Sequence, residues 1–186
     1  NDFTTSFKPS TISDLELWLD ASDTSSLSHS SNAVSIWQDK SGNGYEAVQS
    51  TVANRPTTGS TSTNSLNTLS FDGTDDGLDL ARDVNKPAIN LFVLLKGHGY
   101  LLSNNGTERT AFFDAGSGRK LYWHVNNVSK AAGSAVTGYS DSAYQIHEYS
   151  LNGGLLTLRV NGIERFQSSN VTGKLESDRI GLKWTG

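Results

Sequence analysis

The chain has 186 residues, of which 35% are hydrophobic and 18% are charged, and its formal net charge is −4. This length suits one domain with a buried core. The acidic net charge and the lack of a Lys/Arg cluster argue against a nucleic-acid partner. No apolar run approaches the roughly 20 residues that a membrane span needs. The lack of cysteine excludes disulfides and thiolate sites.

Short alternating or apolar runs recur between clusters of Gly, Asn, Asp and Ser, while helical periodicity is nearly absent. This pattern is typical of an all-β fold made of antiparallel strands. We expect a first strand at 15–19 that ends in a polar turn at 20–23. A Ser-rich loop over 24–35 and a dense turn signal at 38–44 follow, and the polar stretch 50–68 is predicted to be a long loop.

After a tight turn at 72–77, the sequence predicts consecutive strands. The run 90–96 is apolar at successive positions, so we expect a central strand that is buried on both faces. Residues 156–166 predict a hairpin, because Asn161-Gly162 satisfies the positive φ that a type I′ turn requires. The remaining predicted strands lie at 78–80, 100–103, 111–113, 121–125, 144–151 and 179–184.

Four short segments follow one another along the chain: Leu17-Trp18-Leu19-Asp20-Ala21-Ser22-Asp23, then Trp37-Gln38-Asp39-Lys40-Ser41-Gly42-Asn43-Gly44 with Ala47 and Gln49, then Phe71-Asp72-Gly73-Thr74-Asp75-Asp76, and finally Val160-Asn161-Gly162. In this order they resemble the laminin-G-like jelly-roll domains of the concanavalin-A-like superfamily. The resemblance spans about residues 9–182.

The resemblance implies a two-sheet antiparallel β-sandwich of jelly-roll type with little or no helix, and we expect residues 1–186 to form that single domain. It also implies an extracellular, cell-surface or virion-surface location, although a fold restricts function only weakly. Such domains usually add a closing strand after the position of Trp184. We therefore expect this strand to come from a neighbouring chain or from a longer form of this one.

Catalysis is not expected. The glycoside hydrolases of this superfamily need two carboxylates across the sugar, commonly as Glu-x-Asp-x-Glu on one strand face, and the chain contains no such run. One enzymatic alternative stays open, because a jelly-roll polysaccharide lyase needs His, Tyr, Arg and Gln on one concave sheet. Residues of these types alternate along the predicted strands: Tyr122, His124, Gln145, His147, Tyr149 and Arg159.

The leading hypothesis is a non-catalytic, lectin-like surface module for glycan binding or adhesion, whose partner is a polysaccharide or a cell-surface glycan. Aromatic rings can stack on sugars, and strand alternation places Tyr122 and His124 on the face opposite Trp123. The candidate glycan-binding residues are Tyr122, His124, His147, Tyr149 and Arg159. The structural alternative is a component of a larger assembly, such as a virion decoration or fibre protein.

Acidic residues gather in the turn after Phe71. Ca²⁺ prefers several converging carboxylate and carbonyl oxygens, so the candidate calcium ligands are Asp72, Asp75 and Asp76. The competing interpretation is that Asp side chains cap the backbone of the turn while Gly73 supplies a positive φ. The spacing favours the second interpretation, because it is not that of an EF-hand loop.

Overall fold

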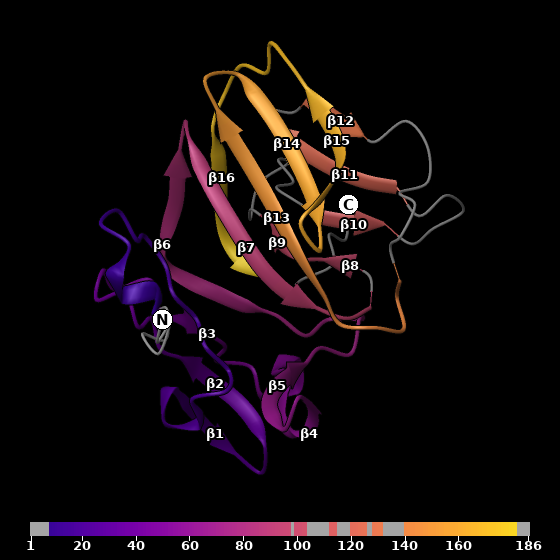
Figure 1. Ribbon diagram of the computed structural model, residues 1–186. Helices are drawn as coiled ribbons and strands as arrows, with labels where there is room; N and C mark the ends of the chain where they lie inside the picture. Colours follow the sequence, from indigo (N-terminus) through magenta and orange to yellow (C-terminus); the bar gives the residue numbers. More distant parts are fainter. Residues whose placement is uncertain are drawn as a thin grey trace, which may run out of the picture.

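The structure is a computed structural model and describes residues 8–97, 99–103, 112–114, 120–125, 128–131 and 140–181. Within these residues the chain consists of β-strands, turns and three short 3₁₀ helices, η1 (Pro9–Thr11), η2 (Thr24–Ser26) and η3 (Val52–Asn54). The strands form antiparallel sheets packed in layers (Figure 1), which confirms the predicted β-sandwich. No helix in the described part is long and apolar enough to cross a membrane.

The largest sheet, which we call the long sheet, has eight strands in the described part of the chain. They are β1 (Leu27–Ser30), β2 (Ala33–Trp37), β3 (Ala47–Val48), β4 (Thr57–Thr63), β5 (Leu66–Ser70), β6 (Leu78–Lys86), β9 (Leu102–Ser103) and β16 (Leu175–Ile180). Their order is β5-β4-β2-β3-β6-β16-β9, and β1 pairs with β2.

A four-stranded sheet, which we call the front sheet, lies in front of β16 and β9 in Figure 1. Its order is β15-β14-β13-β7, with the bounds β7 (Ile89–Leu95), β13 (Gln145–Asn152), β14 (Leu155–Val160) and β15 (Ile163–Ser168). A third sheet has the order β12-β11-β10-β8 and contains β8 (Gly99–Tyr100), β10 (Phe112–Asp114), β11 (Lys120–Val125) and β12 (Val128–Ala131).

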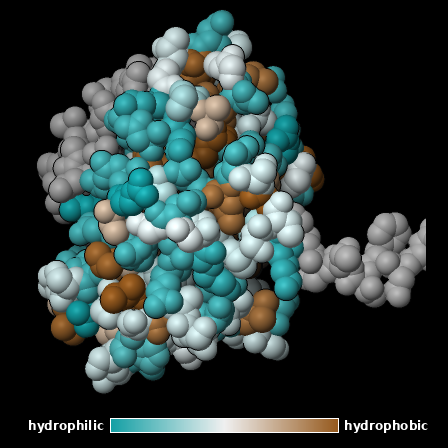
Figure 2. Space-filling view, turned by 90° about the vertical axis from the view of Figure 1, so that its left-hand side faces the viewer, coloured by the Kyte–Doolittle hydropathy of each residue, from teal (hydrophilic) through white to brown (hydrophobic). Residues whose placement is uncertain are grey.

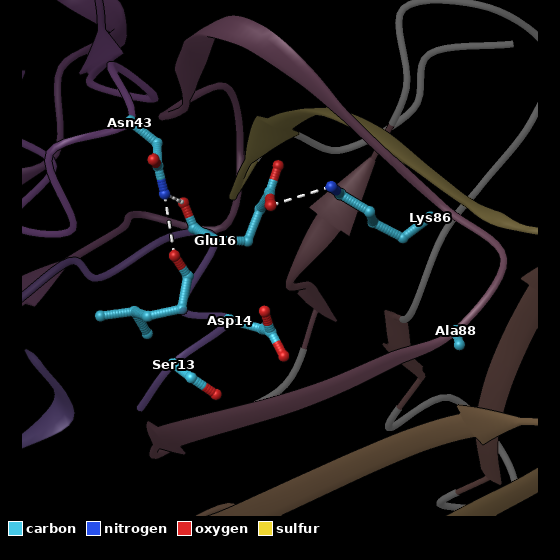
Figure 3. Close-up of a pocket in the computed structure, with 7 residues that line it drawn as sticks. Ser13, Asp14, Glu16, Asn43, Lys86 and Ala88 are labelled. Carbon is cyan, nitrogen blue, oxygen red and sulfur yellow. Dashed lines mark hydrogen bonds and ion pairs between the residues drawn. The ribbon is translucent and has the colours of Figure 1, made fainter. Parts of the chain in front are cut away.

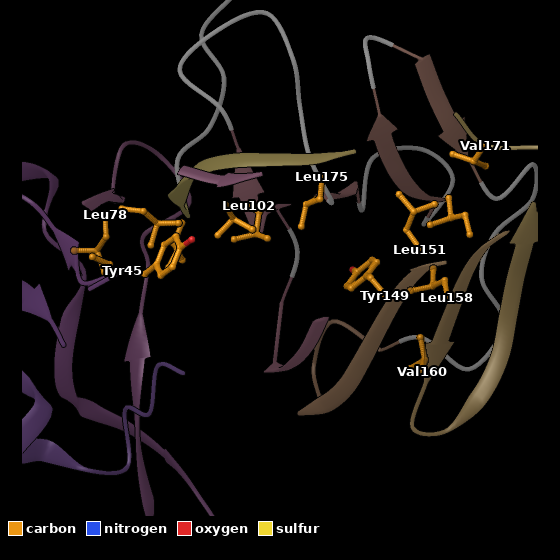
Figure 4. Close-up of a cluster of buried hydrophobic side chains, with 14 residues drawn as sticks. Tyr45, Leu78, Leu102, Tyr149, Leu151, Leu158, Val160, Val171 and Leu175 are labelled. Carbon is orange, nitrogen blue, oxygen red and sulfur yellow. The ribbon is translucent and has the colours of Figure 1, made fainter. Parts of the chain in front are cut away.

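The hydrophobic core lies between the layers (Figure 4). In β13 burial alternates residue by residue, so its odd-numbered side chains face the core and its even-numbered ones face outward. The long sheet contributes Leu78, Leu80, Val84, Leu175 and Ile180, and the front sheet contributes Tyr149, Leu151, Leu156, Leu158 and Val160. Burial of these side chains supplies the main driving force for packing the sheets together.

The Asn-Gly hairpin is confirmed, but the two loops predicted for the first half of the chain are wrong. Asn161 and Gly162 have φ of 51° and 77° and join β14 to β15. The expected loop 50–68 instead contains η3 and the β4–β5 hairpin, and the expected loop 24–35 contains β1 and the start of β2. These strands are rich in Ser and Thr and largely exposed, so they lack the apolar alternation that marks a half-buried strand.

The apolar run 90–96 is also not a central strand in the described part of the chain. It corresponds to β7, which pairs with β13 and stands at the edge of the front sheet. Its outward-facing Phe92 and Leu94 are 63% and 54% exposed. The run does form a strand, but both its predicted central position and its predicted burial on both faces are wrong.

The predicted first strand at 15–19 is also wrong: these residues belong to no strand and form an irregular segment held by side chains from the loop after β2. The Asp39 carboxylate accepts the N–H groups of Trp18 at 3.0 Å, Ser41 at 2.9 Å and Tyr45 at 3.1 Å, and also the Ser41 hydroxyl at 2.7 Å. Burial raises the pKa of Asp39, but these hydrogen bonds outweigh it and leave the pKa below its ordinary value.

Lys40 adds a second connection to the same segment. Its ammonium lies 2.7 Å from Asp23 Oδ2, 3.1 Å from Asp20 Oδ2 and 4.4 Å from the centre of the Trp18 ring. Its backbone N–H also donates to the Trp18 carbonyl at 2.8 Å. Asp39 and Lys40 thus fix residues 16–23 against the long sheet. The first two of the four segments that carry the family resemblance, 17–23 and 37–44, therefore form one structural unit.

Replacement of Asp39 should destabilise the fold because several donors lose their acceptor at once. We expect Asp39→Ala to lower the free energy of unfolding by about 2 kcal/mol, measured by urea denaturation at neutral pH. The exposed Asp83 provides the control, and Asp83→Ala should change stability by less than about 0.5 kcal/mol. Equal effects of the two substitutions would contradict the role given to Asp39.

Candidate functional site

The structure separates the five candidate glycan-binding residues. Tyr122 and His124 belong to β11, and their side chains lie outside the described part of the structure. His147 and Tyr149 are odd-numbered residues of β13 and are 0% and 1% exposed. Arg159 lies on the outward side of β14, where it pairs with Glu148.

Two of the glycan-binding candidates, His147 and Tyr149, are buried in the core, away from the outward side that carries Arg159. Strand alternation was correct, but the face with Gln145, His147 and Tyr149 turns toward the core. His147 Nδ1 lies 3.3 Å from the Tyr149 hydroxyl, and burial lowers the pKa of His147 to about 4. The imidazole is therefore neutral near pH 7 and acts as a core residue.

This low pKa predicts a loss of stability in acid. An unfolded histidine titrates near 6.5, whereas the folded His147 stays neutral down to about 4. Unfolding therefore takes up a proton between these values, so the stability is fully present above pH 6.5 and falls as the pH decreases toward 4. The shift corresponds to about 3 kcal/mol.

The measurement is the free energy of unfolding from urea titrations between pH 7 and pH 4. His147→Gln should flatten the dependence on pH between 6.5 and 4. His29→Gln, which changes an exposed histidine, should leave the dependence unchanged. A His147→Gln protein with the slope of the original chain would contradict the burial of a neutral imidazole.

The outward side of the front sheet carries a mixed polar and apolar surface. We call it the outer face and define it by Asn90, Phe92, Leu94, Ile146, Glu148, Arg159 and Glu164. Strand register aligns four of these residues in one row, because Phe92 lies opposite Glu148, Glu148 opposite Arg159, and Arg159 opposite Glu164. An exposed aromatic ring thus stands at one end of a row of charged groups.

Ion pairs hold the charged part of this row in place. Arg159 Nη1 lies 2.8 Å from Glu148 Oε1, and Arg159 Nη2 lies 3.7 Å from Glu164 Oε2. A guanidinium has five N–H donors and each carboxylate has two acceptor oxygens, so the row keeps hydrogen-bonding capacity toward a ligand. The sequence pointed to Arg159 but not to Phe92, because the run 90–96 was expected to be buried on both faces. It did not point to Glu148 either, because alternation along 144–151 does not reveal which face turns outward.

The acidic turn matches the capping interpretation in detail. Asp72 Oδ1 accepts the N–H groups of Thr74 at 2.8 Å and of Asp75 and Asp76 at 3.2 Å, and Asp76 Oδ2 accepts the N–H of Asp72 at 2.9 Å. Gly73 takes the expected positive φ of 75°. The side chains of Asp72 and Asp76 therefore build the turn.

The same geometry gathers carboxylates. One oxygen from each of Asp72, Asp75 and Asp76 lies within 4.8 Å of the others. Burial, followed by the charges of Asp72 and Asp75, raises the pKa of Asp76. These three oxygens suit a hard cation such as Ca²⁺, although two of the side chains already serve the backbone.

The capping role predicts that Asp72→Ala lowers the melting temperature equally with and without Ca²⁺, because the backbone N–H groups lose their acceptor in both conditions. Differential scanning calorimetry in 1 mM EDTA and in 5 mM CaCl₂ would measure this. Asp75→Asn is the matched control, since the Asp75 carboxylate accepts no backbone bond in the described part of the chain. A stabilisation by Ca²⁺ that disappears in Asp75→Asn would instead indicate a metal site.

An open pocket of about 400 Å³ lies between the N-terminal segment and the β6–β7 hairpin (Figure 3). Lys86 Nζ lies 2.8 Å from Glu16 Oε2, and the Tyr45 hydroxyl also donates to the Glu16 carboxylate. These two interactions hold the pKa of Glu16 below its ordinary value. The lining is mostly polar and consists of Ser13, Asp14, Leu15, Glu16, Asn43, Lys86 and Ala88.

In comparisons with known proteins, no family model, no curated protein and no solved structure matches this chain. The functional interpretation therefore depends on the geometry of the described residues and on the four sequence segments that carry the family resemblance.

Proposed function

We propose that this protein is a non-catalytic, lectin-like surface module that binds a polysaccharide or cell-surface glycan through its outer face. The observation that carries the proposal is the row in which the exposed ring of Phe92 adjoins Glu148, Arg159 and Glu164. Sugar rings offer an apolar face for stacking and a rim of hydroxyl groups for hydrogen bonds. In this row the ring of Phe92 can stack on the apolar face of a sugar, and the charged side chains can form hydrogen bonds with its hydroxyl groups.

The burial of His147 and Tyr149 supports binding over catalysis. A polysaccharide lyase would need such groups within reach of the sugar, and both side chains lie in the core instead. Glu148 is the outward carboxylate of the same strand and lies 2.8 Å from Arg159 Nη1, so its position suits hydrogen bonding to a sugar hydroxyl.

A second candidate function is a structural part of a larger assembly. It is favoured by Phe92, Leu94 and Ile146, which are adjacent in the sheet and each more than half exposed. Contiguous exposed apolar side chains are typical of interaction sites. The four sequence segments described above suggest a laminin-G-like jelly-roll family and, with it, a surface location. Both candidate functions agree with this family and this location, and we propose them together with the function.

The glycan proposal predicts that removal of the row weakens binding. Ligands found on a glycan array would be titrated by calorimetry, with and without Ca²⁺, against Phe92→Ala and Arg159→Ala, and each should weaken binding by about tenfold. Arg179→Ala is the matched control, because Arg179 is ion-paired to Asp79 on the long sheet. A folded protein that binds no glycan under either condition would contradict the proposal.

A further inference from the structure

The two edges of the front sheet differ in a way that has a physical meaning. Unpaired edge strands invite pairing with other chains, and natural proteins protect them with charges, prolines or bulges. The β15 edge is protected, since it carries Glu164 and Arg165 and its pairing with β14 contains a register shift. The β7 edge has seven uncharged residues and an unbroken register with β13.

In the described part of the chain no strand pairs with the second side of β7. Alternate backbone N–H and C=O groups of an edge strand point away from its one neighbour, so β7 presents a regular row of such groups. Buried or half-buried backbone groups normally find partners. The β7 edge therefore has the properties of a strand that pairs with a second strand when the protein functions.

The segment 15–19, which belongs to no strand, offers a second backbone with free groups. Its Glu16 and Trp18 are bonded to the loop after β2, through Ser41 and Asn43 for Glu16 and through Asp39 and Lys40 for Trp18. Between them, the N–H and C=O groups of Leu17 make no hydrogen bond with the described residues, and those of Leu19 make none either. Leu17 and Leu19 pack against the same core cluster as Ile89 and Leu91 of β7.

Charge differs between the two ends of β7. At its beginning, Ala88 lines the pocket that also holds the exposed Asp14, while Glu16 in this pocket is ion-paired to Lys86. At its other end lies the exposed Lys96, whose ammonium is 5.9 Å from the centre of the Tyr144 ring. A strand along this edge would therefore meet the acidic Asp14 at one end and the basic Lys96 at the other.

We propose that the free edge of β7 binds an extended strand from another polypeptide. This proposal rests on the assembly function, the second candidate above, and not on glycan binding. All strand pairings among the described residues are antiparallel. The bound strand accordingly carries an acidic residue near its N-terminus, close to Lys96, and a basic residue near its C-terminus, close to Asp14.

Alternate side chains of the bound strand are apolar and lie beside Leu91 and Val93, and its main chain supplies the hydrogen bonds that give affinity. A second copy of this chain is the alternative occupant of this edge, and the sedimentation test below distinguishes the two.

The face that includes the N-terminal region is mostly hydrophilic, with separate hydrophobic patches (Figure 2). A peptide without broad hydrophobicity is therefore the appropriate probe. We would use acetylated and amidated Glu-(Val-Thr)₃-Val-Lys and its charge-reversed counterpart Lys-(Val-Thr)₃-Val-Glu, which differ only in the direction of the charges.

The first peptide should bind and should protect amides of β7, Leu17 and Leu19 from hydrogen exchange. The reversed peptide should bind about fivefold more weakly, as expected for exposed ion pairs. Asp14→Lys should reduce this preference, and Asp75→Lys, which makes the same charge change in the acidic turn, should not.

The proposal is overturned if neither peptide protects β7, or if the reversed peptide binds equally well. Sedimentation without peptide provides a further test, because a dimer that protects β7 would assign the edge to a second copy. Glycan titrations on the same sample distinguish this proposal from the glycan proposal, since a failure of peptide binding leaves the outer-face row untouched.

Discussion

The arrangement of this protein depends on one half-buried acceptor, the carboxylate of Asp39. It receives three backbone N–H groups and one hydroxyl, and through Trp18 it ties the N-terminal segment to the loop after β2. Leu17 and Leu19 are thereby placed against the core, and Glu16 is placed beside Lys86 at the open pocket. Because the segment is anchored by side chains, its remaining backbone groups stay available.

The four sequence segments that suggested a family each have a role in the fold. Asp39 and Lys40 hold the first two segments together, Asp72 caps the turn of the third, and Asn161 and Gly162 form the hairpin of the fourth. Residues with local structural duties form recognisable patterns at fixed spacing. Residues that meet a ligand on a sheet face come from different strands, so no short motif contains them.

Local chemistry made part of the structure predictable. The Asn161-Gly162 turn could be predicted because its backbone demand is met by two adjacent residues. The β4–β5 hairpin could not, since its Thr and Ser residues show no apolar alternation. The place of β7 at a sheet edge was also hidden, because hydrophobic patterns report burial and not the order of strands.

The candidate site shows the same limit. In 145–151 both faces of the strand mix polar and apolar side chains, so alternation alone does not reveal which face turns inward. The structure answers this through packing, since Tyr149 and Leu151 join the core with His147, and Glu148 remains outside beside Arg159. The row that includes Phe92 can be recognised only when the three strand pairings that align its residues are known.

The central claim is that the outer face, and not the interior of β13, meets the ligand. Backbone NMR of the labelled protein during titration with a glycan selected on an array tests it most directly. The account predicts chemical-shift changes centred on Phe92, Glu148 and Arg159, with little change at Asp72 or Asp39. Changes centred on the acidic turn or spread over the long sheet would contradict it.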